Sequence, residues 1–283
     1  MSSTPFIGLI VTGPQALVDF KIFVGSLEVW HPNAKLYIYT DSDTAIQTIK
    51  TKCTIVFKKA LDAYKGKRRQ EMETTKGIVY DSMFKDYTYE KANVLKWIFD
   101  SEPNAISQGV WFMDADITHL APLPIIPSDT TLALSPHYIQ PSDEARFGKY
   151  NAGYIWFKNS NILDSWRTAG FTSHFFEQAA LEQLVPLNIV YEFPIQVNYG
   201  WWRMFQSQLP PQDHAQKFKL FRPDKSIGIR YDNMPLQSIH THWHELDNSV
   251  TGMFNRWFLQ FLSNYRIHKP ITNFMALIKK AKI

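Results

Sequence analysis

Two hydrophobic patterns alternate along the chain. Short segments that are rich in apolar residues predict buried strands at residues 6–11, 34–40, 53–57, 110–113, 131–134 and 150–157. The runs at 6–11 and 110–113 are continuously apolar and end at turn residues. Longer segments with apolar residues at helical spacing predict helices at residues 17–31, 44–52, 89–99, 163–167 and 175–187. Because strands and helices follow one another in turn, the pattern predicts an α/β fold. Its mostly parallel sheet should be flanked by helices that form right-handed crossovers.

Three segments have a weaker pattern. Residues 58–76 are rich in Lys, Arg and Glu, which indicates a solvated surface loop or, alternatively, a basic lid over an anionic ligand. Residues 193–231 predict loops and short strands. The tail, residues 254–283, has two apolar-periodic stretches that we expect to pack against the body, with contact to a membrane surface as the alternative. No repeat or Gly- or Ser-rich linker divides the chain, so we predict a single domain over residues 1–283.

Composition narrows the possible partners. The chain has 283 residues, 45% of them hydrophobic, which is enough to build a full core. Its net charge of +4 is not concentrated in long basic blocks, so an anionic small molecule fits better than nucleic acid. One cysteine, no long apolar run and no basic segment at the N-terminus predict a soluble protein of a reducing compartment, the cytoplasm.

An acidic pair follows the apolar strand predicted at residues 110–113. Asp114 and Asp116 lie at its carboxyl end, where open α/β sheets bind their ligands, and extended backbone would turn both side chains to one side. Mg²⁺ and Mn²⁺ are bound in proteins by one or two carboxylates together with phosphate oxygens of a nucleotide. The pair therefore predicts a metal-diphosphate site; the alternative is that both residues only cap a turn.

Three histidines alternate with other residues near the C-terminus. In extended backbone His240, His242 and His244 would share one face, and with Glu245 they would resemble a zinc site. A zinc site at this position would leave the Asp114–Asp116 pair unexplained. The other use of a histidine here is as one ligand beside the carboxylates, a set that suits Mn²⁺ better than Mg²⁺.

Four motifs together resemble a known enzyme family. They are the Asp-X-Asp strand, Asn151-Ala152-Gly153, Glu177-Gln178 and the histidine cluster. In this order they resemble nucleotide-sugar-dependent glycosyltransferases of the Rossmann-like GT-A fold, particularly the glycogenin and lipopolysaccharide galactosyltransferase-like group. The resemblance covers residues 5–245. It implies a nucleotide-binding half at about 1–120, an acceptor half at about 121–250 and a C-terminal helical segment at 251–283.

The resemblance also implies a set of ligands. Asp114, Asp116 and His240 would bind Mn²⁺ or Mg²⁺, with His242 as the second candidate for the histidine ligand. The sequence after the histidines lacks the family's Gly and Lys-Pro-Trp. Thr12, Gly13 and Asp41 would contact the nucleoside, with Asp41 favouring uracil and hence a UDP-linked donor. Each of these three is also an ordinary turn former. The acceptor would be a glycan hydroxyl.

The remaining implied residues face the transferred sugar. Lys91 would stabilise the diphosphate, unless it is a surface lysine. Asn151 and Gly153 would contact the sugar, and Gln178 would face both sugar and acceptor. Glu177 is the candidate general base, which favours inversion slightly over retention at the anomeric carbon. The alternative is that Glu177 is not a base and is only an acidic residue in the first turn of a helix.

The sequence leaves two other functions to be weighed against the glycosyltransferase. A sugar nucleotidyltransferase would need a Gly-rich basic loop after the first strand, and Thr12-Gly13-Pro14-Gln15 is not one. A carbohydrate-binding protein without chemistry would use the many aromatic residues as sugar platforms. Trp201, Trp202 and Trp243 would line an acceptor groove or, alternatively, pack in the core.

Overall fold

The computed structural model describes residues 4–221, 228–264 and 269–281. Its strands are β1 (Phe6–Val11), β2 (Lys35–Thr40), β3 (Thr54–Lys59), β4 (Val110–Met113), β5 (Ile117–His119), β6 (Leu132–Pro136), β7 (Tyr150–Phe157), β8 (Val190–Glu192), β9 (Tyr199–Gly200), β10 (Phe218–Leu220), β11 (Ile229–Tyr231), β12 (Met234–Pro235) and β13 (Ser238–His240).

Its helices alternate with these strands. They are α1 (Gly13–Trp30), α2 (Asp43–Gln47), α3 (Arg69–Thr74), α4 (Met83–Ser101), α5 (Ala105–Gln108), α6 (Pro141–Phe147), α7 (Asn161–Gly170), α8 (Trp202–Phe205), α9 (Pro211–Lys217), α10 (Val250–Ser263) and α11 (Lys269–Ala281), with 3-10 helices η1 (Asp62–Tyr64) and η2 (Ala179–Leu187).

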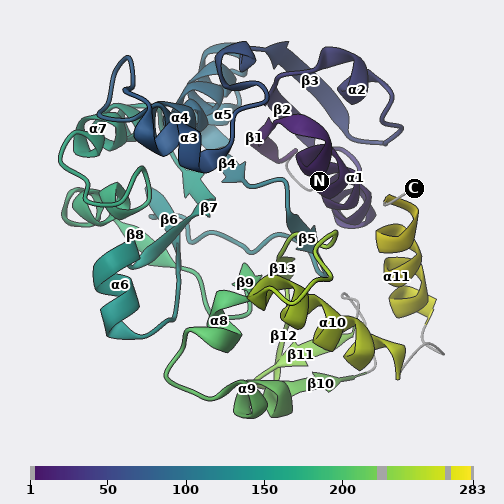
Figure 1. The fold of residues 1–283 in the computed structure, drawn as a ribbon. Helices are drawn as coiled ribbons and strands as arrows, with labels where there is room; N and C mark the ends of the chain where they lie inside the picture. The colour runs from purple at the N-terminus through teal and green to yellow at the C-terminus, as the bar shows by residue number, and fades with distance from the viewer. Residues whose placement is uncertain (1–3, 222–227, 265–268, 282–283) are drawn as a thin grey trace.

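The main sheet has seven strands in the order β3-β2-β1-β4-β7-β6-β8. The β1–β2, β2–β3, β1–β4 and β6–β8 pairs are parallel, whereas β7 runs antiparallel to both β4 and β6. The sheet is therefore mixed and mostly parallel, as the sequence predicts. β4 lies at its middle, beside β1, and its carboxyl end opens toward the smaller sheets (Figure 1).

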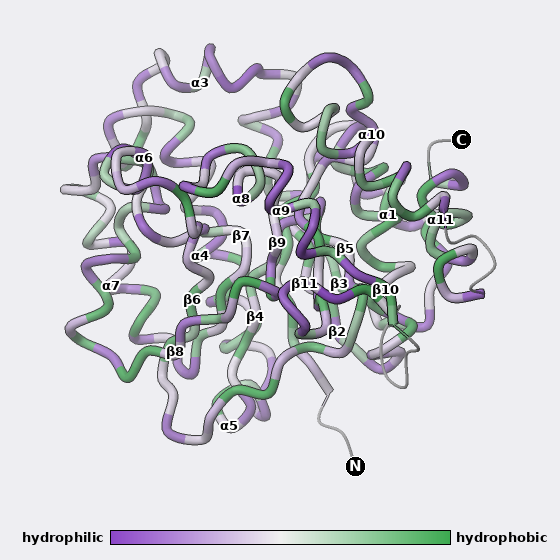
Figure 2. The backbone as a smooth tube through the Cα atoms, turned by 90° about the horizontal axis from the view of Figure 1, so that it is seen from below, coloured by the Kyte–Doolittle hydropathy of each residue, from purple (hydrophilic) through white to green (hydrophobic). Residues whose placement is uncertain are grey.

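The central strands are buried on both faces. In β4, Val110 and Phe112 pack into a cluster with α4, α7 and η2, while Trp111 and Met113 pack into a second cluster with α1. Helices thus cover both faces, which explains why the strand has an unbroken apolar sequence. Figure 2 shows hydrophobic segments in the central strands and hydrophilic residues along outer segments such as α3. Gly109, at φ 74°, makes the turn from α5 into β4.

A three-stranded sheet, in the order β5-β13-β9, joins distant parts of the chain. β13 pairs antiparallel with β5, so that His240 lies opposite Ile117. This pairing brings the histidine segment next to the turn between β4 and β5, which contains both aspartates. Beyond it lies a third sheet, β10-β11-β12 (Figure 1).

The C-terminal helices pack against the body, as predicted. α11 lies beside α1 (Figure 1) and buries Ile271, Phe274 and Ile278 in a cluster shared with α10 and the small sheets. A Cβ atom at Gly25 would lie 2.6 Å from Leu277, so the small residue in α1 makes room for α11. The membrane-surface alternative for the tail stays untested. Among the described residues, no helix has both the length and the apolar character needed to cross a membrane.

Several predicted boundaries were wrong. The helix predicted at residues 44–52 is only Asp43–Gln47, and the one predicted at 89–99 runs over Met83–Ser101, with the Ser82 hydroxyl accepting from Lys85 N–H at its start. The charged loop contains η1 and α3, and residues 193–231 contain α8 and α9 besides short strands.

A few predictions fall partly outside the described residues. These concern residues 1–3 of the N-terminus, 222–227 within the irregular segment, and 265–268 and 282–283 of the tail. The division into a nucleotide-binding half and an acceptor half stays a prediction.

Candidate functional site

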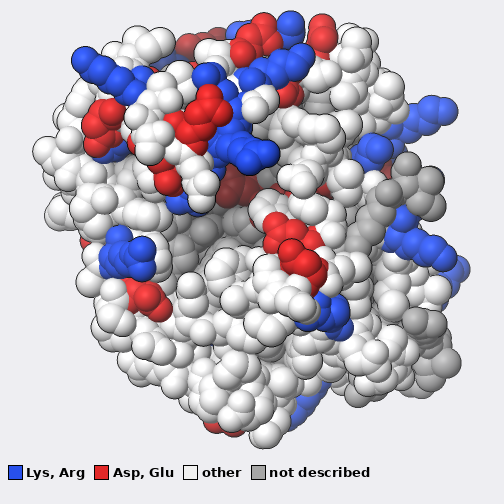
Figure 3. All heavy atoms as spheres, viewed as in Figure 1, with Lys and Arg blue, Asp and Glu red and all other residues white. Residues whose placement is uncertain are grey.

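A cavity of about 510 Å³ lies at the carboxyl end of β4. Figure 3 shows it as a hollow near the middle of this face, with acidic atoms at depth and basic side chains beside it. Its lining is polar at the floor and aromatic at the walls. The polar side chains include Asp19, Lys91, Asp114, Asp116, Asn151, Glu177, Gln178, His240 and His242, and the aromatic ones Phe84, Tyr87, Phe175, Phe176, Trp201 and Trp202.

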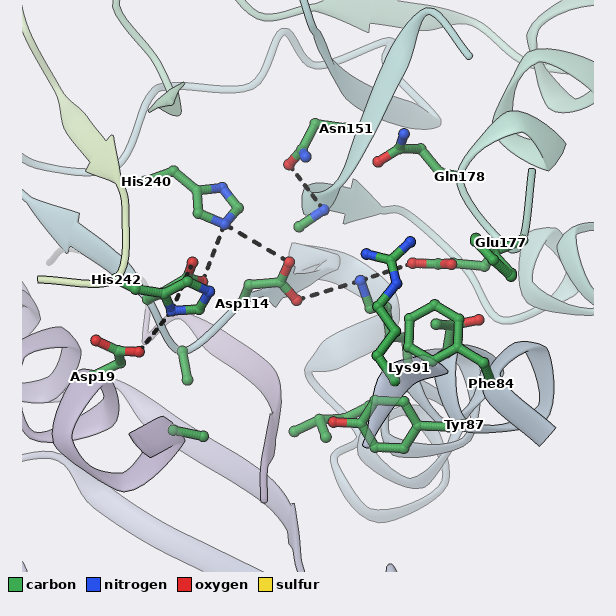
Figure 4. Close-up of a pocket in the computed structure, with 18 of the residues that line it drawn as sticks. Asp19, Phe84, Tyr87, Lys91, Asp114, Asn151, Glu177, Gln178, His240 and His242 are labelled. Carbon is green, nitrogen blue, oxygen red and sulfur yellow. Dashed lines mark hydrogen bonds and ion pairs between the residues drawn. The ribbon is translucent and has the colours of Figure 1, made fainter. Parts of the chain in front are cut away.

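Asp114, Asp116 and His240 converge at the floor of this cavity. Figure 4 shows Asp114 and His240 facing each other there. His240 Nε2 lies 3.0 Å from Asp116 Oδ1 and 3.8 Å from Asp114 Oδ2. One ligand atom from each residue lies within 4.8 Å of the others, so the three can bind one cation. Asp114 and Asp116 do not converge by strand alternation, because residues 114–116 form a turn rather than extended backbone.

The pKa values of the two carboxyl groups, Asp114 and Asp116, are shifted in opposite directions. Burial raises the pKa of Asp114, and the charge of Asp116 adds to this effect while Lys91 opposes it. Burial acts on Asp116 in the same sense, but the imidazoles of His240 and His242 outweigh it and lower the pKa of Asp116 below its ordinary value. The floor therefore holds a charged carboxylate in a buried place, where a divalent cation would be an effective counter-charge.

The orientation of His240 is set by Asn198. The His240 Nδ1–H donates to Asn198 Oδ1 at 2.8 Å, which leaves Nε2 free for the carboxylates or a cation. Asn198 Nδ2 donates to Asn151 Oδ1 and to Ser135 Oγ, each at 3.0 Å. Asn198 is fully buried and takes the left-handed backbone conformation, φ 56°, that asparagine tolerates better than most residues.

Asn151 and Gly153 flank the aspartates from β7. The Gly153 carbonyl accepts from Asp114 N–H at 2.8 Å, and Gly153 N–H donates to Asn151 Oδ1 at 3.0 Å. A Cβ atom at Gly153 would overlap Asp114 Oδ2 and lie 2.6 Å from His240 Cε1. Only glycine therefore fits beside the Asp114–His240 pair.

Lys91 forms the centre of a buried charge network. Its Nζ lies 2.9 Å from Glu177 Oε1 and 3.3 Å from Asp114 Oδ1, and it donates to the Ala152 carbonyl at 3.2 Å (Figure 4). Burial alone would lower the pKa of Lys91, but the two carboxylates outweigh it and raise the pKa above its ordinary value. Lys91 is 9% exposed, so it is not the surface lysine of the alternative interpretation.

Glu177 and Gln178 line the cavity but do not open a helix. They lie in a turn before η2, and Phe176 just ahead of them has φ 41°. Glu177 is buried against Lys91, while the Gln178 amide donates to the Phe147 carbonyl at 2.8 Å. The prediction that this pair starts an α-helix over residues 175–187 was wrong.

Thr12, Gly13 and Asp41 lie beside this cavity rather than in it. Gly13 N–H donates to both Asp41 oxygens, at 3.1 and 3.2 Å, and both residues line a neighbouring cavity of about 280 Å³ together with Lys65. Thr12 Oγ1 is hydrogen-bonded to Tyr87 OH at 2.9 Å, and Tyr87 lines the main cavity. The structure thus brings the three residues together at the border of the site.

The three histidines do not form one metal site. His242 and His244 face Asp19 on α1: His242 Nδ1 is 2.8 Å from Asp19 Oδ2, and His244 Nδ1 is 3.6 Å from Asp19 Oδ1. His242 also faces Asp116, as His240 does. The negative charge of Asp116 and the bond to Asp19 raise the pKa of His242 to about 10, although burial opposes this. Among the described residues, two groups of side chains could hold a metal ion: Asp114, Asp116 and His240, and Asp19, His242 and His244. Glu245 belongs to neither.

The three tryptophans also separate. Trp201 and Trp202 line the cavity, and the Trp202 ring lies edge-on to His240 with centroids 5.0 Å apart. Trp243 is buried in the core, where its Nε1–H donates to Thr118 Oγ1 at 2.7 Å.

Comparison with known proteins gives the fold. No protein-family model matches the sequence, and no curated protein sequence matches it. Among solved structures, the galactosyltransferase LgtC in complex with donor and acceptor sugar analogues is similar over 97% of this chain and 95% of its own, with a TM-score of 0.51 and 12% identity. The chain has the GT-A fold.

Two further structures are less similar. An active-site mutant of LgtC is similar over 91% of this chain and 95% of its own, with a TM-score of 0.49 and 13% identity. The apo structure of the bifunctional glycosyltransferase WbbM is similar over 71% of this chain, with a TM-score of 0.45 and 10% identity; the match spans only 40% of WbbM.

The candidate site contains residues that sequence reasoning missed. Asn198, Tyr87 and Asp19 carried no signal, because each depends on contacts with distant segments. Arg69 is the exception, since it belongs to the basic segment considered as a lid. It lines the cavity and stacks on Phe84, with its guanidinium carbon 4.7 Å from the ring centroid.

Proposed function

We propose that the protein is a metal-dependent glycosyltransferase that moves a sugar from a nucleoside diphosphate donor to a glycan hydroxyl. The proposed nucleotide of the donor is UDP. The observation that carries this proposal is the convergence of Asp114, Asp116 and His240 on the floor of a cavity that also holds Lys91 and Glu177. The GT-A fold supports it, because the fold puts this floor at the carboxyl ends of the central strands.

The donor set fits a divalent cation. Two carboxylates and one imidazole suit Mn²⁺, and Asn198 fixes the ring so that Nε2 is available. When bound, the cation would neutralise the charge that develops on the diphosphate leaving group. Lys91 is less available for this role, because it is already paired with two carboxylates.

The chain's own residues position the donor. Arg69, at the cavity wall, supplies a cation for the diphosphate, and the nucleoside extends toward Thr12, Gly13 and Asp41 past Tyr87. Asn151, Gly153 and Gln178 line the same cavity and would contact the sugar. Trp201 and Trp202 provide apolar faces for the acceptor glycan.

The stereochemical outcome depends on the state of Glu177. The sequence favours Glu177 as a base and hence inversion. A base must be free to approach the acceptor hydroxyl, however, and Glu177 Oε1 is already engaged by Lys91 Nζ at 2.9 Å. We therefore propose that Glu177 positions the sugar through Lys91 and that transfer occurs with retention; inversion with Glu177 as base is the alternative.

The transfer itself exchanges one C–O bond for another. The acceptor oxygen forms a bond to the anomeric carbon, the bond from that carbon to the β-phosphate oxygen breaks, and the electron pair leaves with the diphosphate. The acceptor proton is lost in the same step. In a retaining transfer the departing phosphate oxygen can take this proton, so no protein base is required.

A screen of nucleotide sugars tests the proposal. The purified chain is incubated with a panel of UDP-, GDP- and CMP-sugars, with and without Mn²⁺, and the released nucleotide is measured. We expect slow hydrolysis of one or a few UDP-sugars only when Mn²⁺ is present. If no nucleotide sugar is hydrolysed or bound while free glycans bind without metal, the protein is a carbohydrate-binding protein instead.

A further inference from the structure

A second group of possible metal ligands lies beside the first. Asp19, His242 and His244 each offer a ligand atom, and these atoms all lie within 4.8 Å of one another. Asp19 comes from α1, whereas both histidines follow β13, so the group joins segments more than two hundred residues apart in the sequence. Figure 4 shows Asp19 and His242 facing each other next to His240 and Asp114.

Two atoms of this group are buried without a hydrogen-bond partner among the described residues. They are Asp19 Oδ1 and His244 Nδ1, and they lie 3.6 Å apart. This distance is too long for a normal hydrogen bond between nitrogen and oxygen. It is close to the separation of about 3.4 Å expected for two ligands at about 2.1 Å from one tetrahedral cation. The pair is therefore arranged as two ligands of a common ion.

The buried carboxylate of Asp19 is paired with His242 through Oδ2, but its Oδ1 has no hydrogen-bond partner among the described residues. The residue lies within α1, not at its end, and it is only 2% exposed. A buried carboxylate is costly unless it is paired or binds a metal. Its described polar neighbours are His242 Nδ1 at 2.8 Å and His244 Nδ1 at 3.6 Å, both nitrogen atoms that can ligate a cation.

Asp116 lies between the two groups. Its Oδ1 is 3.0 Å from His240 Nε2, and its Oδ2 is 3.5 Å from His242 Nδ1. Each carboxylate oxygen thus faces the nitrogen ligands of a different group. A carboxylate in this position can bridge two cations, as in sites where two metal ions lie about 3.5–4 Å apart.

We propose that Asp19, His242 and His244 bind a second divalent cation, Zn²⁺ or a metal with similar ligand preferences. Asp116 would be shared between this ion and the one bound by Asp114 and His240. Two imidazoles with carboxylate oxygens are a typical zinc ligand set, and imidazole binds Zn²⁺ more tightly than Mn²⁺. The ion would face the main cavity, because Asp19 and His242 line it. It would also connect α1 to the segment after β13.

The alternative is an ordinary hydrogen-bonded pair of His242 and Asp19. In that case His244 would have no role, and added metal would occupy only the first site. The two possibilities differ in the number of ions bound, which can be measured without any nucleotide or sugar. The outcome is therefore independent of whether the chain is a glycosyltransferase.

The test is equilibrium dialysis of the metal-free full-length chain against Zn²⁺, followed by metal analysis. We expect two ions per chain for the wild type. His244→Phe, which keeps a ring of similar shape at a partly exposed position, should bind one, as should the isosteric Asp19→Asn. The matched control is His240→Phe, which removes a ligand of the first site and should also bind one.

Co²⁺ distinguishes which site has been lost. Co²⁺ in a tetrahedral site absorbs far more strongly in the visible range than octahedral Co²⁺. We expect a strong band from the Asp19, His242 and His244 site that persists in His240→Phe and disappears in His244→Phe. Circular dichroism confirms that each variant is folded; if Asp19→Asn is not, His244→Phe alone decides. A wild-type stoichiometry of one, or two ions retained in folded His244→Phe, would overturn the proposal.

Discussion

His240 donates its Nδ1–H to Asn198 Oδ1 at 2.8 Å, and this bond aims Nε2 at the carboxylates of Asp114 and Asp116. Asn198 also donates to Asn151 Oδ1, so one buried side chain aligns residues from β7 and β13. The candidate metal site therefore depends on a residue that would not itself touch the cation.

Replacing Asn198 by glycine should weaken cation binding without unfolding the chain. Glycine tolerates the left-handed backbone at this position, so the variant chiefly removes the side-chain bonds. We expect Mn²⁺ affinity to fall by about 10–100-fold, as for other lost partners of metal-binding histidines. Titration calorimetry measures this, with the exposed Asn33→Gly as control. An unchanged affinity would show that His240 is aligned by other contacts.

Lys91→Met should destabilise the metal-free protein. The substitution leaves the carboxylates of Asp114 and Glu177 close together without a buried cation. Breaking such a network costs about 3 kcal/mol of the free energy of unfolding, measured by urea denaturation at pH 7. The double variant Lys91→Met/Glu177→Gln should recover part of this loss. If the single variant is as stable as the wild type, the network does not contribute to the fold.

Glu177→Gln distinguishes a positioning role from a base. If Glu177 positions the sugar, turnover should fall by about 10-fold to 100-fold, whereas loss of a general base costs about 10²–10⁴-fold. The anomeric configuration of the first product, followed by proton NMR, provides the independent readout. We expect an α-linked product from an α-linked donor. A β-linked product would establish inversion and restore Glu177 as the candidate base.

Two buried histidines should make stability fall in mild acid. Burial lowers the pKa of His119 to about 3 and that of His137 to about 4. Below about pH 6.5 the unfolded chain binds protons that the folded chain does not, so stability decreases as the pH falls. Between pH 7 and pH 5 the loss should be about 2 kcal/mol for His119.

The control for this prediction is His119→Phe. Phenylalanine keeps a ring against Phe23, whose centroid lies 5.1 Å from that of His119, but it does not titrate. Urea denaturation of both proteins at pH 7 and pH 5 should show a smaller decrease for the variant. Equal decreases would mean that His119 is protonated in the folded protein.

The sequence predicts most of the sheet because its strands are marked locally. Residues 6–11 are an unbroken apolar run, residues 150–157 are apolar apart from Asn151, and both strands have the predicted bounds. Asp114 and Asp116 could be placed at the site for the same reason, since the end of a central strand is where such a sheet binds ligands.

Features that depend on distant contacts could not be predicted. Asn198 and His240 are 42 positions apart, and Asp19 and His242 are 223 apart, so no local pattern links them. The helix predicted around Glu177 has helical periodicity, but Pro186 lies inside it and the segment forms a 3-10 helix after a turn.

The most direct test of the metal-dependent donor site is the binding of UDP with and without Mn²⁺. Titration calorimetry of the wild type should show binding of UDP only when Mn²⁺ is present. Asp116→Asn, which keeps the shape of the side chain, should abolish this metal-dependent binding, and Asp114→Asn should weaken it less. Binding of UDP that is equally strong without metal, or unaffected by Asp116→Asn, would contradict the account.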